Sequence, residues 1–102
     1  MTKYLFVYYG GMSGSTPAEQ EKSMKVWTAW FTGMGKALVD MGAPTEPGKK
    51  VSKTGVRAIG ANPVTGYSII QAANIDKAVD MAKACPIMDE GGSIAIYEAL
   101  PM

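Results

Sequence analysis

Residues 16–42 read TPAEQEKSMKVWTAWFTGMGKALVDMG and predict one long amphipathic helix. Thr16 and Glu19 have the spacing of a capping box, and Pro17 stands at the first helical position, where a missing N–H is tolerated. Gly42 follows the last apolar residue and predicts the end of the helix. The apolar residues between these ends recur at steps of three and four and predict one packed stripe: Met24, Trp27, Phe31, Met34, Leu38 and Met41. The rest of the chain must supply the surface on which this helix packs.

Runs of β-branched and aromatic residues on either side of this segment predict strands. Residues 3–9 read KYLFVYY and are apolar at both alternating sets of positions, which predicts a strand covered on both faces. Further strands are predicted at 49–53, 56–59, 66–72 and 93–100. Asn74 is a suitable N-cap for a second helix over 75–84, which would turn Ile75, Ala78, Val79 and Ala82 inward.

The order strand, helix, strand pair, helix, strand is the split βαβ pattern of ferredoxin-like domains. We therefore predict an α+β fold in one domain over residues 1–102, a ferredoxin-like βαββαβ antiparallel sheet with two helices on one face. Because the first strand is apolar on both sides, the uncovered face predicts a homodimer in which two sheets form a dimeric α+β barrel.

Composition excludes several classes of function. Lysine plus arginine number 10 and aspartate plus glutamate number 9, so a nucleic-acid partner is not expected. The absence of histidine excludes a histidine general base and the usual zinc site within this chain, so no metal and no cofactor are expected. Cys85 is the only cysteine, which fits a reducing compartment. No segment resembles a membrane span or a signal peptide, and we expect a cytoplasmic protein.

The glycine-rich segment 10–15, GGMSGS, joins the first strand to the long helix. Such a turn before a helix can bind phosphate. The segment lacks the lysine of a P-loop and the spacing of a dinucleotide fold, which favours a simple connector, with Ser13 and Ser15 as solvated loop residues.

Two sets of residues are candidates for a site. Glu98 alternates with the apolar residues of the last predicted strand, and a carboxylate buried on such a face would have a perturbed pKa suited to acid/base catalysis. A structural or solvent-facing role for Glu98 is the alternative. A second set of aromatic residues could line a ligand pocket: Tyr8, Tyr9, Trp27 and Tyr67. Trp27 also lies on the helix stripe and could be a core residue instead.

The last third of the chain, from Val64 to Met102, resembles the end of YCII-related domains. The similar features, in order, are Gly66-Tyr67, Asn74-Ile75-Asp76-Lys77-Ala78, Pro86, Gly92-Ser93-Ile94, Glu98 and Pro101-Met102. The first strand and residues 37–44, ALVDMGAP, are also similar. The resemblance implies a dimeric α+β barrel. One member of that family is a dehydrochlorinase acting on an aromatic compound, and a His-Asp pair is proposed as the site in some members. This chain has Cys85 and Ile87 where many similar short sequences carry histidines.

Three functions remain open from the sequence. The leading hypothesis is a YCII-related homodimer that binds a small molecule in a pocket between sheet and helices, without an established reaction. The alternative is a lyase or isomerase that acts on a small cyclic or aromatic acid, with Glu98 as the acid/base. The third is a structural partner module without a pocket.

Overall fold

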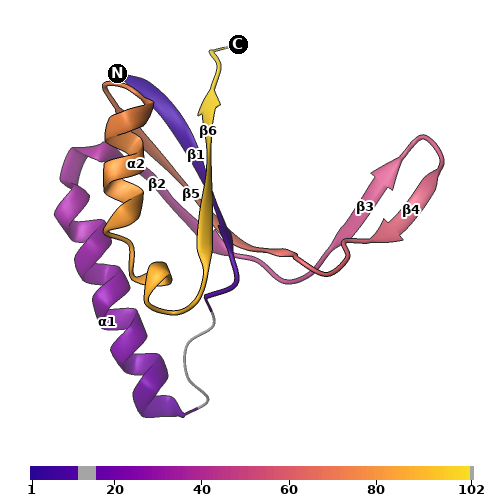
Figure 1. The fold of residues 1–102 in the computed structure, drawn as a ribbon, viewed down its shortest axis with the longest axis horizontal. Coiled ribbons are helices and arrows are strands. Elements are labelled where there is room, and N and C mark those ends of the chain that lie inside the picture. Colours follow the sequence, from indigo (N-terminus) through magenta and orange to yellow (C-terminus); the bar gives the residue numbers. More distant parts are fainter. Residues whose placement is uncertain (12–15, 102) are drawn as a thin grey trace.

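A computed structural model describes residues 1–11 and 16–101 of the chain (Figure 1). It is an α+β fold with two α-helices, α1 (Pro17–Met34) and α2 (Ile75–Lys83). The main sheet contains four strands: β1 (Thr2–Tyr9), β2 (Leu38–Pro44), β5 (Val64–Ala72) and β6 (Ser93–Ala99). Their order across the sheet is β2-β5-β1-β6, and all neighbouring strands are antiparallel. The predictions of α+β class and of an antiparallel sheet are therefore confirmed.

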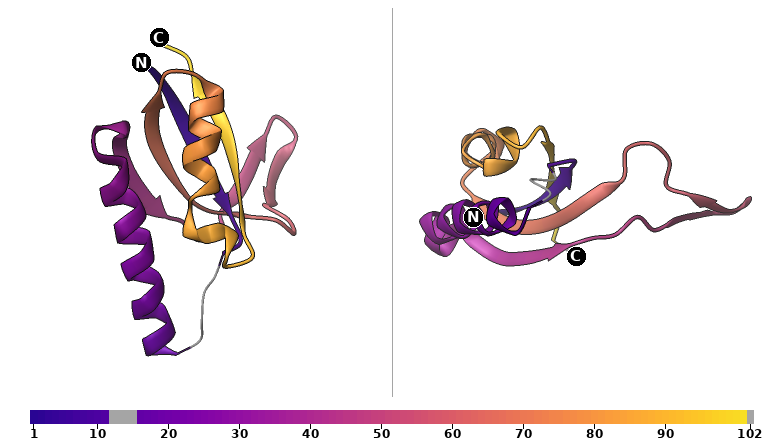
Figure 2. Two further views of the ribbon diagram at one scale, coloured as in Figure 1. Left: turned by 60° about the vertical axis from the view of Figure 1, so that its left-hand side comes forward. Right: turned by 90° about the horizontal axis from the view of Figure 1, so that it is seen from below.

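Both helices pack on one face of this sheet (Figure 2). The alternation of β1 places Tyr4, Phe6 and Tyr8 on that face, where all three are buried. Residues of both helices pack against the same core cluster: Trp27, Trp30 and Met34 of α1, and Ala78, Met81 and Ala82 of α2. Leu5 and Val7 of β1 lie on the opposite face and are half-buried, because no helix covers that side.

The helix α1 begins where the sequence predicts. The Thr16 hydroxyl accepts a hydrogen bond from the Glu19 backbone N–H at 3.1 Å, and Pro17 is the first helical residue. The Thr16 hydroxyl in turn donates to the Glu19 carboxylate at 3.0 Å. These two contacts fix the first turn of the helix.

The predicted end of this helix at Gly42 is wrong. The helix ends at Met34, a short 3₁₀ helix η1 (Gly35–Ala37) follows, and residues 38–44 form the edge strand β2. Gly35 has φ +54°, which a right-handed helix does not allow, and the segment after it pairs with β5 instead. Leu38 of the predicted stripe still packs against the same core, from a strand, whereas Met24 and Met41 of that stripe are 70% and 57% exposed.

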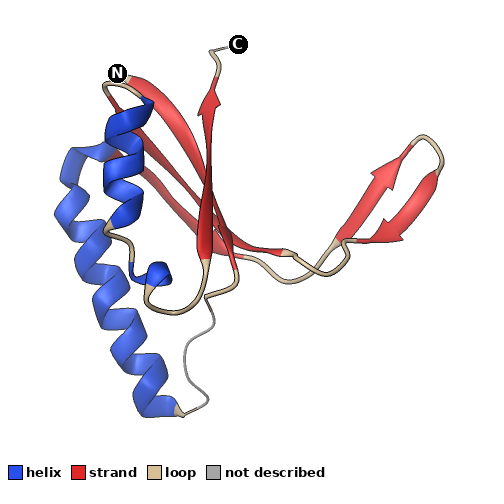
Figure 3. Ribbon diagram, in the orientation of Figure 1, coloured by secondary structure: helices blue, strands red, loops and turns tan. Residues whose placement is uncertain are grey.

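Residues 49–58 form a separate hairpin, with β3 (Lys49–Ser52) and β4 (Gly55–Ala58) paired only to each other. The predicted strand pair exists, but it is not part of the main sheet. In Figures 1 and 3 this hairpin projects from the ends of β2 and β5 on the side away from the helices. All of its residues are exposed.

The helix α2 forms as predicted, and the Asn74 side chain caps it by accepting from the Lys77 N–H at 3.0 Å. Ala78 and Ala82 are buried, whereas Ile75, expected to face inward, is 48% exposed. After α2 a 3₁₀ helix η2 (Pro86–Met88) leads into β6. No helix of the described residues is long and apolar enough to cross a membrane. The predicted loop residues Ser13 and Ser15 lie outside the described part of the chain.

Candidate functional site

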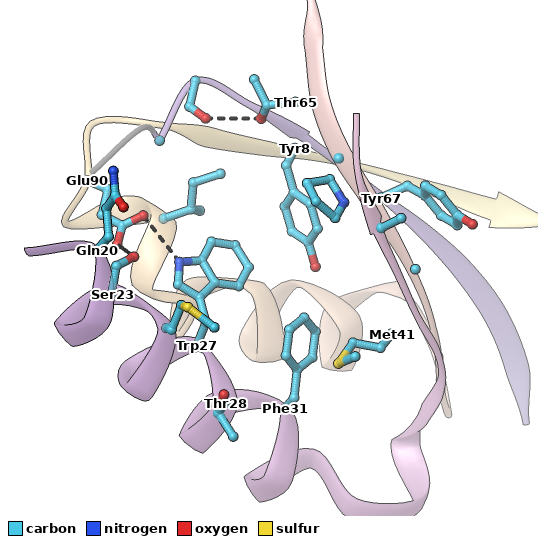
Figure 4. A pocket seen from close by; sticks show the side chains of 18 residues that line it. Tyr8, Gln20, Ser23, Trp27, Thr28, Phe31, Met41, Thr65, Tyr67 and Glu90 are labelled. Carbon is cyan, nitrogen blue, oxygen red and sulfur yellow. Dashed lines mark hydrogen bonds between the residues drawn. The ribbon is translucent and has the colours of Figure 1, made fainter. Parts of the chain in front are cut away.

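A cavity of about 530 Å³ lies between α1, the edge of the sheet formed by β1, β5 and β2, and the loop after η2 (Figure 4). Its lining is mainly apolar, with three aromatic rings and a few polar groups at one end. Apart from glycines, the described residues that line it are Tyr8, Gln20, Ser23, Met24, Trp27, Thr28, Phe31, Met41, Ala43, Pro44, Thr65, Tyr67, Ile87 and Glu90. A cavity of this size and character is typical of small-molecule sites.

Three aromatic rings form the central wall of the cavity. Trp27 and Phe31 are four residues apart on α1 and therefore lie on the same face of the helix, with ring centroids 5.9 Å apart. Tyr8 reaches the same place from the helix-facing side of β1, and its ring meets that of Trp27 edge to face at 5.3 Å. The helical period of α1 and the alternation of β1 together place the three rings on one side of the cavity.

Glu90 lies at one end of the cavity, as Figure 4 shows, and is held by two donors from α1. Ser23 Oγ donates to one carboxylate oxygen at 2.6 Å, and the indole N–H of Trp27 donates to the other at 3.2 Å. The loop itself is fixed by its backbone, since the Glu90 N–H and the Gly92 N–H both donate to the Ile87 carbonyl. The carboxylate therefore has a defined position although it stands on a loop.

The Tyr8 hydroxyl is part of a buried chain of hydrogen bonds. It donates to Ser68 Oγ at 2.7 Å, and the Ser68 hydroxyl donates to the Met41 carbonyl at 2.7 Å. This chain joins β1, β5 and β2. Burial raises the pKa of the Tyr8 hydroxyl well above its ordinary value, so the group stays protonated at neutral pH and is a poor candidate for a general base.

Cys85 lies at the end of α2 and is buried. Burial raises the pKa of its thiol to about 12, and the nearby Glu90 carboxylate acts in the same direction. A thiol of this kind is almost entirely protonated at neutral pH and is not a nucleophile. Within residues 1–11 and 16–101 no three acidic or sulfur side chains are grouped so that they could hold a metal ion.

The four residues predicted to bind a ligand divide between two faces of the sheet. Tyr8 and Trp27 line the cavity. Tyr67 borders it from β5, but Figure 4 shows its ring pointing away from Trp27 and Phe31. Tyr9 follows Tyr8 on β1 and therefore projects from the opposite face of the sheet.

Glu98, the predicted acid/base, is not among the residues that line the cavity. It is opposite Tyr4 in the pairing of β6 with β1, and it is exposed near the end of the strand. This is the solvent-facing position that the sequence left open as the alternative. The carboxylate in the cavity is that of Glu90.

Sequence reasoning missed Glu90 and Ser23 as site residues. Ser23 is four residues before Trp27 and so shares its helix face, which is a signal the sequence contains. Glu90 is 67 residues from Ser23 and lies in a loop, so only the folded arrangement brings the two together. Trp30, which lies off the predicted stripe, also packs inward, and its indole N–H donates to the Met81 carbonyl at 3.1 Å.

Fold and cavity together define a small α+β protein with an aromatic cavity between one helix and its sheet. In comparisons of the sequence, no protein-family model matches and no curated protein matches significantly.

Proposed function

We propose that this protein is a ferredoxin-like dimeric α+β barrel of the YCII-related type, which binds a small organic molecule in the cavity beside α1. The observation that carries the proposal is the cavity itself. Its volume of about 530 Å³ accommodates a small ligand, and its apolar walls end in a few polar groups that could orient that ligand.

The strand order supports the ferredoxin-like part of the proposal. Counted in chain order among the four strands of the main sheet, the spatial order β2-β5-β1-β6 is second, third, first, fourth. One α-helix follows the first of these strands and one follows the third. This order supports the interpretation of the main sheet as a βαββαβ unit. On this interpretation the β3–β4 hairpin is an insertion between the second and third strands.

The uncovered face of the sheet supports the dimer. Leu5 and Ile69 are directly opposite each other on this face, as are Leu5 and Tyr97, and Val7 and Tyr67 form the next pair. Tyr97 is 55% exposed. A contiguous apolar surface of this kind is uncommon on a monomer and is typical of an interface. A second copy of the chain would cover it in the arrangement expected for a dimeric barrel.

The geometry favours binding over catalysis. Burial keeps both the Tyr8 hydroxyl and the Cys85 thiol protonated at neutral pH by raising their pKa values. Glu98, on which the lyase or isomerase alternative depends, is exposed outside the cavity. A ligand-binding role instead depends on the aromatic and polar residues that line the cavity.

Ligand-detected and protein-observed NMR with a library of small aromatic compounds tests the proposal. We expect a subset of the library to shift amide signals around Trp27, Phe31 and Glu90.

A variant at the cavity wall assigns these shifts to the cavity. Thr28 is an exposed residue at that wall, so Thr28→Phe should occlude the cavity and abolish the shifts. Thr32→Phe, one turn along the same helix and outside the lining, is the matched control and should bind as the unmodified protein does. A protein that binds no member of the library, or binds equally after Thr28→Phe, would contradict the proposal.

A further inference from the structure

The cavity carries a carboxylate at one end, and no lysine or arginine is among its described lining residues. Glu90 is the only charged side chain among the described residues that line it. Among residues 1–11 and 16–101, no lysine or arginine nitrogen lies within 4.0 Å of the Glu90 carboxylate. The ion pair found among these residues joins Lys25 to Glu21. Two neutral donors, Ser23 and Trp27, occupy one position on each carboxylate oxygen. A carboxylate has about four acceptor positions, so room remains for a further donor.

The aromatic wall next to Glu90 favours the same kind of group. Trp27 donates its indole N–H to Glu90, so the edge of this ring adjoins the carboxylate, and the same residue lines the cavity. Tyr8 and Phe31 place further rings at 5.3 Å and 5.9 Å from the Trp27 centroid. Aromatic faces attract ammonium groups through their quadrupoles, and a nearby carboxylate adds a direct Coulomb attraction.

The far end of the cavity is apolar. In Figure 4, Met41 lies at the opposite end from Glu90, and Phe31 lies between them. Methionine and phenylalanine side chains adapt well to aliphatic or aromatic groups. The cavity therefore combines a negative, aromatic end with an apolar end, and a complementary ligand has a cationic head and an apolar body.

We propose that the cavity binds an organic amine, with its ammonium group against Glu90 and Trp27 and its apolar body toward Phe31 and Met41. This proposal rests on the proposed binding function and specifies its ligand class. It departs from the aromatic acid considered from the sequence. The carboxylate of such an acid would be repelled by Glu90 and would meet no cationic side chain among the described lining residues.

A matched series of three ligands tests the charge preference: 3-phenylpropylamine, 3-phenylpropanol and 4-phenylbutyrate. They share one apolar body and differ in their end group. Binding at neutral pH is followed by tryptophan fluorescence, excited where the phenyl ring does not absorb, since Trp27 lines the cavity. We expect the amine to bind about tenfold or more tightly than the alcohol, and the carboxylate to bind more weakly than either. Added salt should weaken binding of the amine and leave that of the alcohol nearly unchanged.

Two variants assign the preference to Glu90. Glu90→Gln should reduce the affinity for the amine to that for the alcohol. Asp89→Asn makes the same change in net charge at a neighbour outside the cavity lining and should leave the amine affinity unchanged. Thermal unfolding of both variants checks that they are folded. If Glu90→Gln does not fold, the ligand series and the salt dependence measured on the unmodified protein still provide the test.

The outcomes separate this proposal from the one on which it rests. Equal or tighter binding of the carboxylate, or unchanged amine binding in folded Glu90→Gln, would overturn the ligand class and leave a cavity that binds something else. Binding of neutral aromatic compounds without binding of the amine would do the same. A cavity that binds neither this series nor any compound of the aromatic library would overturn both proposals.

Discussion

At the scale of single residues, Ser68 is a polar side chain buried in the core of the sheet. It is fully buried, and it is both the acceptor for the Tyr8 hydroxyl and a donor to the Met41 carbonyl. Ser68→Ala would leave a buried hydroxyl without an acceptor and a carbonyl without a donor. We expect it to lower the free energy of unfolding by about 2–3 kcal/mol, measured by urea denaturation.

A double-mutant cycle separates this network from simple packing. Tyr8→Phe removes the hydroxyl that donates to Ser68 but leaves the hydrogen bond from Ser68 to the Met41 carbonyl. It should therefore lower the free energy of unfolding by only about 1 kcal/mol. The double variant should then be less destabilised than the sum of the two single variants, because no tyrosine hydroxyl is left unpaired. Ser52→Ala, at an exposed position of the hairpin, is the control. Additive losses would show that the three-strand hydrogen-bond chain has no cooperative effect.

At the scale of elements, the positive φ of Gly35 marks the boundary between α1 and β2, and one glycine on each side of it provides a test. Gly33 lies in the helix, and a β-carbon added there would meet no neighbouring atom within 4 Å. Gly42 has φ +74°, and a β-carbon added there would lie 1.8 Å from the Tyr67 carbonyl oxygen. Gly33→Ala should therefore raise the unfolding free energy by about 0.5–1 kcal/mol through helix propensity. Gly42→Ala should lower it by about 2–4 kcal/mol through strain and collision with β5. Thermal denaturation of the two variants checks both signs, and similar effects from both would contradict this boundary.

The same boundary explains how far local sequence signals reach. Capping residues determine a helix start within a few residues, so Thr16 and Pro17 sufficed to place the beginning of α1. Its end depends on whether residues 38–44 gain more from continuing the helix or from pairing with β5, and the three-residue spacing of Leu38 and Met41 indicates only the helix. The alternative is decided by tertiary pairing, which the local pattern does not contain.

The candidate site shows a similar division. Tyr8 and Trp27 follow from strand alternation and helix period, and both line the cavity. Tyr9 and Tyr67 were grouped with them by residue type, although alternation along β1 puts Tyr9 on the other face. Glu90 could not be placed from the sequence, because its contact with Ser23 depends on how the loop after α2 meets the first turns of α1.

At the scale of the whole molecule, the uncovered sheet face and the β3–β4 hairpin lie on the same side, away from the helices (Figures 1 and 2). The hairpin exposes Val51 at 74% and Val56 at 63%. A two-stranded hairpin alone is marginally stable in water, and an apolar sheet face gains free energy when covered. One second copy of the chain placed against the open face could satisfy both requirements, which is why a dimer is preferred to an unrelated partner.

Sedimentation equilibrium measures the assembly directly. We expect the unmodified protein to sediment as a dimer, and Tyr97→Lys to shift it toward monomer because a charge on the open sheet face would be desolvated in a sheet-to-sheet interface without a partner. Ile75→Lys places the same charge at an exposed apolar residue of α2, on the helix side of the molecule, and should leave the dimer intact. If the two variants change assembly equally, the interface is not the open face. If the unmodified protein is monomeric at micromolar concentration, the apolar face and the hairpin must be stabilised within one chain, and the dimeric barrel is wrong.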